Sequence, residues 1–258
     1  MLGPGTTVTH AAIRTVADCG CLVAWTGEQG VRFYAQGMGE TRSAVRFLQQ
    51  ARLWADPAQR LRIVRRMYEM RFRDPLDSEL TLRQIRGKEG ARVRAAYADA
   101  ATRFGVDWKG RSYDHSAWDA SDPVNRALSA ANSTLYGVCH AAIVAAGYSP
   151  SLGFIHTGKM LSFVYDVGDL YKMEVIVPAA FMEVAQGQVN LESRVRHRCR
   201  DLFVERDLLG RVLTDLDHLL GAAPESATAV ALDRDQATPG DIWDPSGNVA
   251  GGRNFEEM

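Results

Sequence analysis

Apolar positions recur at spacings of three and four residues along most of this chain, which predicts a mainly helical fold. One such helix face holds Glu89 among four apolar residues, Leu82, Ile85, Val93 and Ala96. Asp56-Pro57 and Asp122-Pro123 are helix starts, because each puts a capping Asp before a Pro at the first helical position. The expected helices cover residues 6–20, 41–54, 57–72, 80–105, 122–147 and 189–221.

A β-hairpin is expected near the N-terminus, where the apolar runs CLVAW and VRFYA flank the Gly-bearing segment TGEQG. A lone hairpin is marginally stable, so it needs further strands or a helical surface to pack on. The pattern therefore predicts an α+β protein with three parts: an N-terminal helix and hairpin (1–36), a larger all-α domain (37–221) and a flexible acidic tail (222–258). The tail has few core-forming residues, and its aromatic residues, Trp243 and Phe255, are candidate docking points.

Composition places the chain among globular proteins. Hydrophobic residues make up 46% and charged residues 24% of the 258 residues, which is ordinary for a globular domain. The sequence has no apolar run long enough to span a bilayer and no basic-then-apolar signal at its N-terminus. We therefore expect a cytoplasmic protein without membrane contact. Its four cysteines make no CxxC pair, which disfavours zinc and predicts free, mostly buried thiols.

Charge is segregated although the net charge is only −1. Residues 60–94 hold eleven Lys or Arg against five Asp or Glu, whereas residues 201–258 hold twelve acidic against four basic residues. A basic excess that runs across two expected helices indicates a polyanionic partner such as nucleic acid.

The segment GFIHTGKM, residues 153–160, almost matches the phosphate-binding pattern GxxxxGK[ST] of nucleotide hydrolases. Met160 cannot supply the hydroxyl that binds magnesium, and the preceding AAIVAAGY is typical of a helix end rather than a strand. Nucleotide hydrolysis is therefore disfavoured. What remains is a basic loop ahead of a helix, where backbone N–H groups and Lys159 would attract a phosphate.

Carboxylates in apolar surroundings are the main chemical signal. Asp166 and Asp169 are three residues apart, so on a helix they share one face. Glu89 interrupts an apolar helix face, where an unpaired carboxylate is costly. Glu89 therefore is either protonated or has a partner, which is an Arg of a neighbouring helix or a metal ion. With His156, these carboxylates form a suitable ligand set for Mg²⁺ or Mn²⁺ and a poor one for structural zinc. A divalent-metal site beside a basic surface indicates phosphodiester chemistry on nucleic acid.

Four segments resemble the integrase of the CRISPR adaptation module, most closely its type I-E branch: RGKEGARVR, RSYDHSAW, NSTLYGV and GFIHTGKMLSFVYDVGDLYK. The resemblance covers the chain from Leu2 to about Gly221. It implies an N-terminal β-rich domain and a helical catalytic domain. It also implies that Glu89, His156 and Asp169 bind a divalent metal, Mg²⁺ or Mn²⁺, and that Asp166 supports them as a further catalytic residue.

The same resemblance implies DNA contacts and partners. Basic residues near DNA fall on Lys159, Lys172 and Arg32, and tyrosines near the site fall on Tyr113 and Tyr136. Members of the family form homodimers that bracket a small CRISPR-associated companion subunit, and they bind double-stranded and branched DNA. The family's opening strands have no counterpart in this sequence, so the β domain is expected to be shortened or its start to be assigned late.

The function that the resemblance implies is metal-dependent DNA integration with associated endonuclease activity. In that reaction the 3′-hydroxyl of captured foreign DNA is joined to the repeat array by transesterification. Two alternatives stay open at this point. One is a metal-dependent nuclease that acts on branched or single-stranded repair intermediates without integration. The other is a non-enzymatic DNA-binding scaffold.

Overall fold

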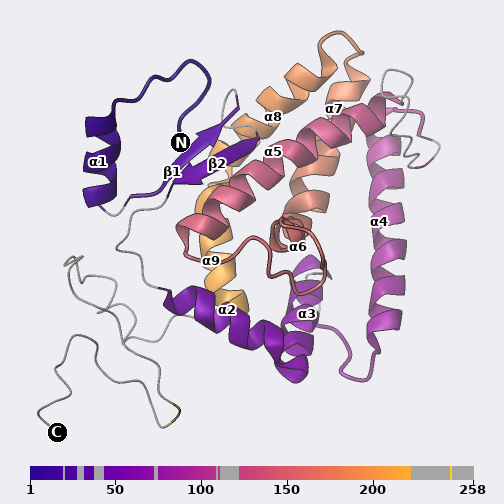
Figure 1. Ribbon diagram of the computed structural model, residues 1–258. Coiled ribbons are helices and arrows are strands. Elements are labelled where there is room, and N and C mark those ends of the chain that lie inside the picture. Colours follow the sequence, from indigo (N-terminus) through magenta and orange to yellow (C-terminus); the bar gives the residue numbers. More distant parts are fainter. Residues whose placement is uncertain are drawn as a thin grey trace, which may run out of the picture.

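The computed structural model describes residues 1–19, 21–27, 32–37, 44–72, 75–108, 110, 122–221 and 245. Figure 1 shows a two-stranded sheet beside a larger set of helices, which confirms the expected α+β class. The strands are β1 (Val23–Thr26) and β2 (Phe33–Gly37). The helices are α1 (His10–Asp18), α2 (Val45–Ala55), α3 (Pro57–Phe72), α4 (Leu82–Phe104), α5 (Pro123–Ala145), α6 (Ser162–Tyr171), α7 (Val177–Ala185), α8 (Leu191–Glu205) and α9 (Leu208–Leu220).

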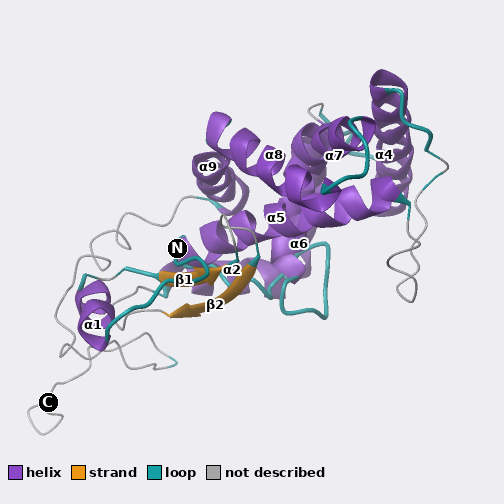
Figure 2. Ribbon diagram, turned by 90° about the horizontal axis from the view of Figure 1, so that it is seen from above, coloured by secondary structure: helices purple, strands orange, loops and turns teal. Residues whose placement is uncertain are grey.

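The hairpin packs on the helices, as a lone hairpin requires. β1 and β2 are antiparallel, and the backbone of Leu2 bonds the other edge of β1 at Ala24 and Thr26, over 2.7 and 2.8 Å. Phe33 stacks on the imidazole ring of His140 in α5, with ring centroids 3.8 Å apart. Figure 1 and Figure 2 both place α1 and the hairpin on one side of the helices and α4 on the opposite side.

α5 is the central helix, and α6, α7, α8 and α9 pack against it. Its side chains Leu128, Leu135 and Ile143 are fully buried, as are Phe163 of α6 and Phe181 of α7. The hydrophobic core therefore lies in the helical part of the chain. This packing fixes α6, the helix that carries the two aspartates singled out by the sequence.

The predicted helix starts are confirmed. α3 begins at Pro57 and α5 begins at Pro123. The carboxylates of Asp56 and Asp122 each accept a backbone N–H from the turn that follows, at 2.8 and 3.4 Å. α4 begins with a reciprocal capping box, in which Thr81 is the N-cap residue.

The C-terminal half differs from the expected helices in two places. The helix expected over 189–221 is two helices, α8 and α9, because Asp207 adopts a left-handed φ of 43° and its carboxylate caps the new helix at the Gly210 N–H. The expected helices also omit α6 and α7, although the loop at residues 153–160 was expected to precede a helix. All residues from 162 to 184 are buried or half-buried.

Between α6 and α7 the helix widens into a π-helical turn, Lys172–Ile176. Pro178 accounts for it, because proline has no N–H and its ring crowds the carbonyl four residues earlier. The N–H of Val177 instead donates to the Lys172 carbonyl, five residues back. α6, the π-helical turn and α7 are thus one continuous helical run, and such turns often lie at functional sites.

None of the helices in the described ranges is long and apolar enough to cross a membrane. Cys139 and Cys199 are buried free thiols, as expected, whereas Cys19 and Cys21 are free but exposed. The predictions for Tyr113 and for the acidic tail with Trp243 and Phe255 lie outside the described residues.

Candidate active site

The fully buried carboxylate of Asp166, on α6, organises the loop that holds His156. Its Oδ2 accepts the backbone N–H groups of Phe154 (2.6 Å) and Ile155 (3.0 Å). Its Oδ1 accepts the backbone N–H of His156 at 2.9 Å and lies 2.7 Å from the Nδ1 atom of the same residue. One carboxylate thus fixes both the loop backbone and the orientation of the imidazole ring.

This arrangement sets the chemistry of His156. The hydrogen bond to Asp166 raises the pKa of the imidazole, against the opposing effect of burial. Because Nδ1 bonds Asp166, Nε2 is the ring nitrogen left to bind a ligand. Gly153 makes the loop possible, since a Cβ there would lie 2.4 Å from the His156 carbonyl oxygen and 2.7 Å from the Ser162 Cβ.

Glu89, on α4, has the arginine partner that the sequence left as one alternative. The guanidinium of Arg71, on α3, donates to Glu89 Oε1 at 2.8 Å and lies 3.5 Å from Asp169 Oδ2. The Arg71 side chain is only 4% exposed. Burial disfavours its charge, but Asp169 and Glu89 outweigh that effect and raise its pKa.

Sequence reasoning did not identify Arg71, although a signal was present. The buried residues of α3 follow helical spacing, Ile63, Val64, Met67 and Tyr68, and Arg71 continues that stripe four residues after Met67. An arginine on an apolar stripe needs a carboxylate partner, just as Glu89 needs a cation. Arg71 and Glu89, which each interrupt an apolar helix face, are therefore each other's partners.

Lys172, at the start of the π-helical turn, is the second cation beside Asp169. Its Nζ lies 3.2 Å from Asp169 Oδ1 and 3.3 Å from the Tyr136 hydroxyl. Burial disfavours the charged amine, but Asp169 more than compensates and raises the pKa of Lys172. Gly168 lets Tyr136 pack closely on α6, because a Cβ there would lie 2.7 Å from Tyr136 Cε1.

These groups line one cavity of about 230 Å³, which we call the Glu89 cavity. It brings together the three predicted metal ligands Glu89, His156 and Asp169, from α4, the α5–α6 loop and α6, and three cations, Arg71, Arg92 and Lys172. Two carboxylates and an imidazole are donors that fit Mg²⁺ or Mn²⁺. In the structure Arg71 bridges both carboxylates, and among the described residues no three His, Cys, Asp or Glu side chains are arranged to hold a metal ion.

The predicted DNA-contacting residues are not all at this cavity. Lys172 lines it, and Tyr136 touches it through Lys172. Lys159 is exposed on the His156 loop, where its N–H donates to Ser162 Oγ at 3.1 Å. Arg32 is exposed in the distant hairpin, with a left-handed φ of 67°.

Several arginines of the basic segment serve the fold. Arg60 donates to the Phe154 carbonyl at 3.0 and 3.1 Å and so supports the His156 loop. Arg65 donates to the Leu80 carbonyl and Arg66 to the Leu219 carbonyl, at 2.5 and 2.9 Å. The positive charge available to a polyanion is therefore smaller than the count of basic residues suggests.

Comparison with known proteins gives one consistent family. Residues 70–216 match the family model described as CRISPR associated protein Cas1. A relative from Thermus thermophilus, named CRISPR-associated endonuclease Cas1 2, is 55% identical over 251 residues, which cover 97% of this chain and 77% of the relative.

Solved structures show the same likeness. A crystal structure of a TtCas1–DNA complex is 58% identical, with a TM-score of 0.80, and the match covers 85% of this chain and 82% of that chain. A casposase bound to its integration product shares the fold, with a TM-score of 0.61 at 16% identity, over 85% of this chain and 83% of that one.

Proposed function

Because this chain belongs to the Cas1 family of CRISPR-associated proteins, we propose that it is a metal-dependent DNA endonuclease and integrase with its active site at the Glu89 cavity. The observation that carries the proposal is the convergence of Glu89, His156 and Asp169 on one cavity, from three separate segments. DNA as substrate is supported by the relative's name, an endonuclease, and by the DNA in the TtCas1 complex.

Glu89, His156 and Asp169 would hold the divalent ion, Mg²⁺ or Mn²⁺. A bound ion of this kind polarises a phosphoryl oxygen and stabilises the charge that builds up as the phosphodiester bond is broken. Asp166 keeps the His156 ring in position through its bond to Nδ1. This second contact of the histidine is the kind that usually orients a metal-binding imidazole.

Arg71 sets the condition for metal binding. Its guanidinium contacts both Glu89 and Asp169, so it has to withdraw from at least one of them when a cation binds there. Lys172 can stay beside Asp169 and, with the hydroxyl of Tyr136, present two donors to a phosphate oxygen. Exposed Lys159 would hold a neighbouring phosphate of the same strand.

Integration is the finer part of the proposal. The 3′-hydroxyl of a donor strand attacks a phosphodiester of the repeat array, so one phosphate ester bond forms as another breaks. The attacking hydroxyl gives up its proton, and the departing 3′-oxygen of the target takes one up. We further propose that the chain acts as a homodimer with a small CRISPR-associated companion subunit, on double-stranded and branched DNA, in the cytoplasm.

A strand-transfer assay tests this function against the alternative of a nuclease without integration. A labelled DNA donor with either a 3′-hydroxyl or a 3′-dideoxy end is mixed with a supercoiled repeat plasmid, the companion subunit and Mn²⁺. The expected result is label joined to the plasmid only with the 3′-hydroxyl donor. If a branched DNA tested in parallel is cleaved but no label is joined to the plasmid, the protein is a nuclease without integrase activity. If neither cleavage nor joining occurs at any metal concentration, the protein is a non-enzymatic DNA-binding scaffold.

A further inference from the structure

The backbone of the loop that carries His156 is hydrogen-bonded on both sides. This loop, residues 149–156, lies between α5 and α6. The carbonyl oxygens of residues 149–154 all accept a hydrogen bond. Those of residues 150 and 151 accept backbone N–H groups, at 2.9 and 3.0 Å. The other carbonyls accept from side chains of α2 and α3, so these two helices determine where the loop lies.

Gln50, on α2, makes three bonds to this loop, and its side chain is fully buried. Its Oε1 accepts the Ser149 N–H at 2.7 Å. Its Nε2 donates to the Ser149 carbonyl at 3.0 Å and to the Leu152 carbonyl at 3.1 Å. A glutamine amide offers two N–H donors and one carbonyl oxygen, and all of them are used here. An apolar side chain at this position would leave three backbone groups of the loop without their partner.

Two further side chains hold the next two carbonyls of the loop. The indole N–H of Trp54, on α2, donates to the Gly153 carbonyl at 3.0 Å. Arg60, on α3, donates to the same carbonyl at 3.2 Å and to the Phe154 carbonyl at 3.0 and 3.1 Å. Its guanidinium also lies 5.1 Å from the centroid of the Trp54 ring. We call Gln50, Trp54 and Arg60 the loop clamp.

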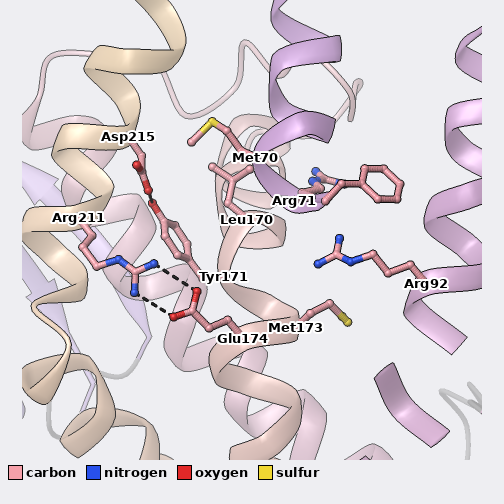
Figure 3. Close-up of a pocket in the computed structure, with 10 residues that line it drawn as sticks. Met70, Arg71, Arg92, Leu170, Tyr171, Met173, Glu174, Arg211 and Asp215 are labelled. Carbon is pink, nitrogen blue, oxygen red and sulfur yellow. Dashed lines mark hydrogen bonds and ion pairs between the residues drawn. The ribbon is translucent and has the colours of Figure 1, made fainter. Parts of the chain in front are cut away.

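The opposite side of the loop is held by α6, where Asp166 accepts three backbone N–H groups. α6 and the π-helical turn after it are themselves bonded to α9, as Figure 3 shows. The Tyr171 hydroxyl donates to Asp215 at 2.6 Å, and Arg211 bonds Glu174 at 3.2 and 3.3 Å. The loop therefore lies between two supports, α6 through its N–H groups and the loop clamp through its carbonyls.

The position of the His156 ring depends on this loop backbone. The His156 side chain is 43% exposed, so packing fixes the ring only in part. A shift of the backbone would move the ring relative to Glu89 and Asp169, which lie on α4 and α6. Groups that bind one ion together have to be held within about 0.5 Å of their productive positions.

We propose that the loop clamp positions His156 for metal binding, so that the placement of α2 sets the affinity of the site for its ion. This inference rests on the proposed function, in which His156 is a ligand of Mg²⁺ or Mn²⁺. Gln50, Trp54 and Arg60 are positioning residues, because they act through the loop backbone. None of the three is among the described residues that line the Glu89 cavity.

Gln50→Met tests the loop clamp, and Gln49→Met is its matched control. Methionine has about the length of glutamine but no amide. Gln49 is the neighbour of Gln50 on α2, and its Nε2 also donates to backbone carbonyls, those of Leu220 at 2.8 Å and Gly221 at 3.3 Å, at the end of α9. Both variants should lower Tm, because each leaves carbonyls without their donor. Only Gln50→Met should disturb the His156 loop.

Hydrogen exchange in EDTA measures the loop without metal. The amides of residues 154–156 bond Asp166 and not Gln50. In Gln50→Met they should exchange about tenfold faster, since the loop loses roughly the net contribution of one hydrogen bond. In Gln49→Met they should exchange as in the wild type. Unchanged exchange in Gln50→Met, or equal acceleration in both variants, would overturn the proposal.

Electron paramagnetic resonance of free Mn²⁺ measures the consequence for metal binding. Residues that directly orient a metal ligand change the metal affinity by about 10- to 100-fold, and the loop clamp acts one step further away. Gln50→Met should therefore raise the Kd for Mn²⁺ about tenfold, the low end of that range. More Mn²⁺ should then restore most of its DNA cleavage. Faster loop exchange with an unchanged Kd would overturn the metal part of the proposal.

Trp54→Phe gives a second test that holds even if Gln50→Met does not fold. It removes one N–H donor but keeps an aromatic ring at a residue that is 36% exposed. Exchange at residues 154–156 should rise about threefold, because Arg60 still bonds the Gly153 carbonyl. Trp25→Phe, in the hairpin at 38% exposure, should leave that exchange unchanged. Equal exchange in Trp54→Phe and the wild type would overturn the proposal.

The two measurements also separate this inference from the proposed function. Faster loop exchange in Gln50→Met, together with a wild-type protein that binds no Mn²⁺, would count against the proposed function and leave the loop clamp in place. Normal Mn²⁺ binding by the wild type with unchanged loop exchange in Gln50→Met would count against the loop clamp alone.

Discussion

Glu89→Gln tests whether Glu89 is a metal ligand, the partner of Arg71, or both. The substitution keeps the shape of the side chain and removes its charge. In the structure Glu89 Oε1 accepts from the buried Arg71 guanidinium at 2.8 Å, so the change weakens an ion pair that is largely shielded from water. Removing one partner of a buried pair outright costs about 3–5 kcal/mol.

The expected loss is smaller than that, for two reasons. Gln retains a neutral acceptor for Arg71, and Arg71 keeps Asp169 at 3.5 Å and the Asp166 carbonyl at 3.4 Å. A hydrogen bond to a charged group contributes about 1.5–3 kcal/mol, so we expect a loss of roughly 2 kcal/mol in EDTA. For a chain of this size, that is a fall in Tm of about 4–8 °C.

Metal binding by Glu89 is measured separately, as the increase in the free energy of unfolding when Mn²⁺ is added. An ion at a hundred times its Kd stabilises the fold by about 2.7 kcal/mol. Glu89→Gln should lose most of this increment. Glu174→Gln is the matched control, because Glu174 also pairs with arginines but lies outside the Glu89 cavity. It should lose stability in EDTA and keep the Mn²⁺ increment.

Arg71→Met completes the set. Without the guanidinium, Glu89 and Asp169 lose a shared cation, so the variant should be less stable in EDTA. Its Mn²⁺ increment should exceed that of the wild type, because the ion no longer competes with Arg71 for the two carboxylates. Thermal melting of all four proteins, with EDTA and with Mn²⁺, gives the comparison. An intact Mn²⁺ increment in Glu89→Gln would falsify the metal role of Glu89, and an unchanged increment in Arg71→Met would refute the competition.

Three further predictions concern the groups around this site. Asp166→Asn should reduce DNA cleavage by about 10- to 100-fold and loosen the His156 loop, because the amide nitrogen that replaces one carboxylate oxygen cannot accept the backbone N–H groups bonded to that oxygen. Faster hydrogen exchange at residues 154–156 would show the loosening, and unchanged exchange would contradict it. Gly153→Ala should lower Tm by several degrees and disturb the same loop, because the added Cβ would overlap backbone atoms that cannot move aside. A variant with the Tm and the activity of the wild type would refute the steric reasoning. Burial lowers the pKa of His140 from 6.5 to about 4, so the contact between neutral His140 and Phe33 should stabilise the docked hairpin fully above pH 6.5 and less as the pH falls towards 4. Hydrogen exchange at the β2 amides should therefore become faster over that range in the wild type but not in His140→Phe. Equal pH profiles of exchange in the two proteins would contradict this.

Local signals in the sequence account for the features that were predicted correctly. Asp56-Pro57 and Asp122-Pro123 define helix starts through contacts within one turn, so they do not depend on the rest of the fold. The position of Glu89 on an apolar face correctly indicated that it needs a partner. The family resemblance implied that Asp166 supports the site, and this role stays a prediction; the structure shows its carboxylate bonded to the His156 ring.

The features that were missed depend on contacts between distant segments. Which cation meets Glu89 is decided by how α3 packs on α4, and the sequence spacing of Arg71 and Glu89 does not encode it. The break at Asp207 requires a left-handed backbone that few residues other than glycine adopt, so the helical pattern runs on through it. α6 and α7 were left out of the expected helices, and their buried residues contact segments that are distant in the sequence.

The π-helical turn at Lys172–Ile176 makes the length of this stretch as important as its composition. A π-helical turn holds one residue more than an α-helical turn would, and each residue of an α-helix turns the chain by about 100°. Deleting a single residue there would restore ordinary helical winding and rotate the aspartate face of α6 relative to the core face of α7. Substitutions in this stretch can be tolerated one at a time, whereas an insertion or deletion would misalign Asp169 with a core that is otherwise intact. Among descendants of this sequence, the stretch should therefore vary in residue type but not in length.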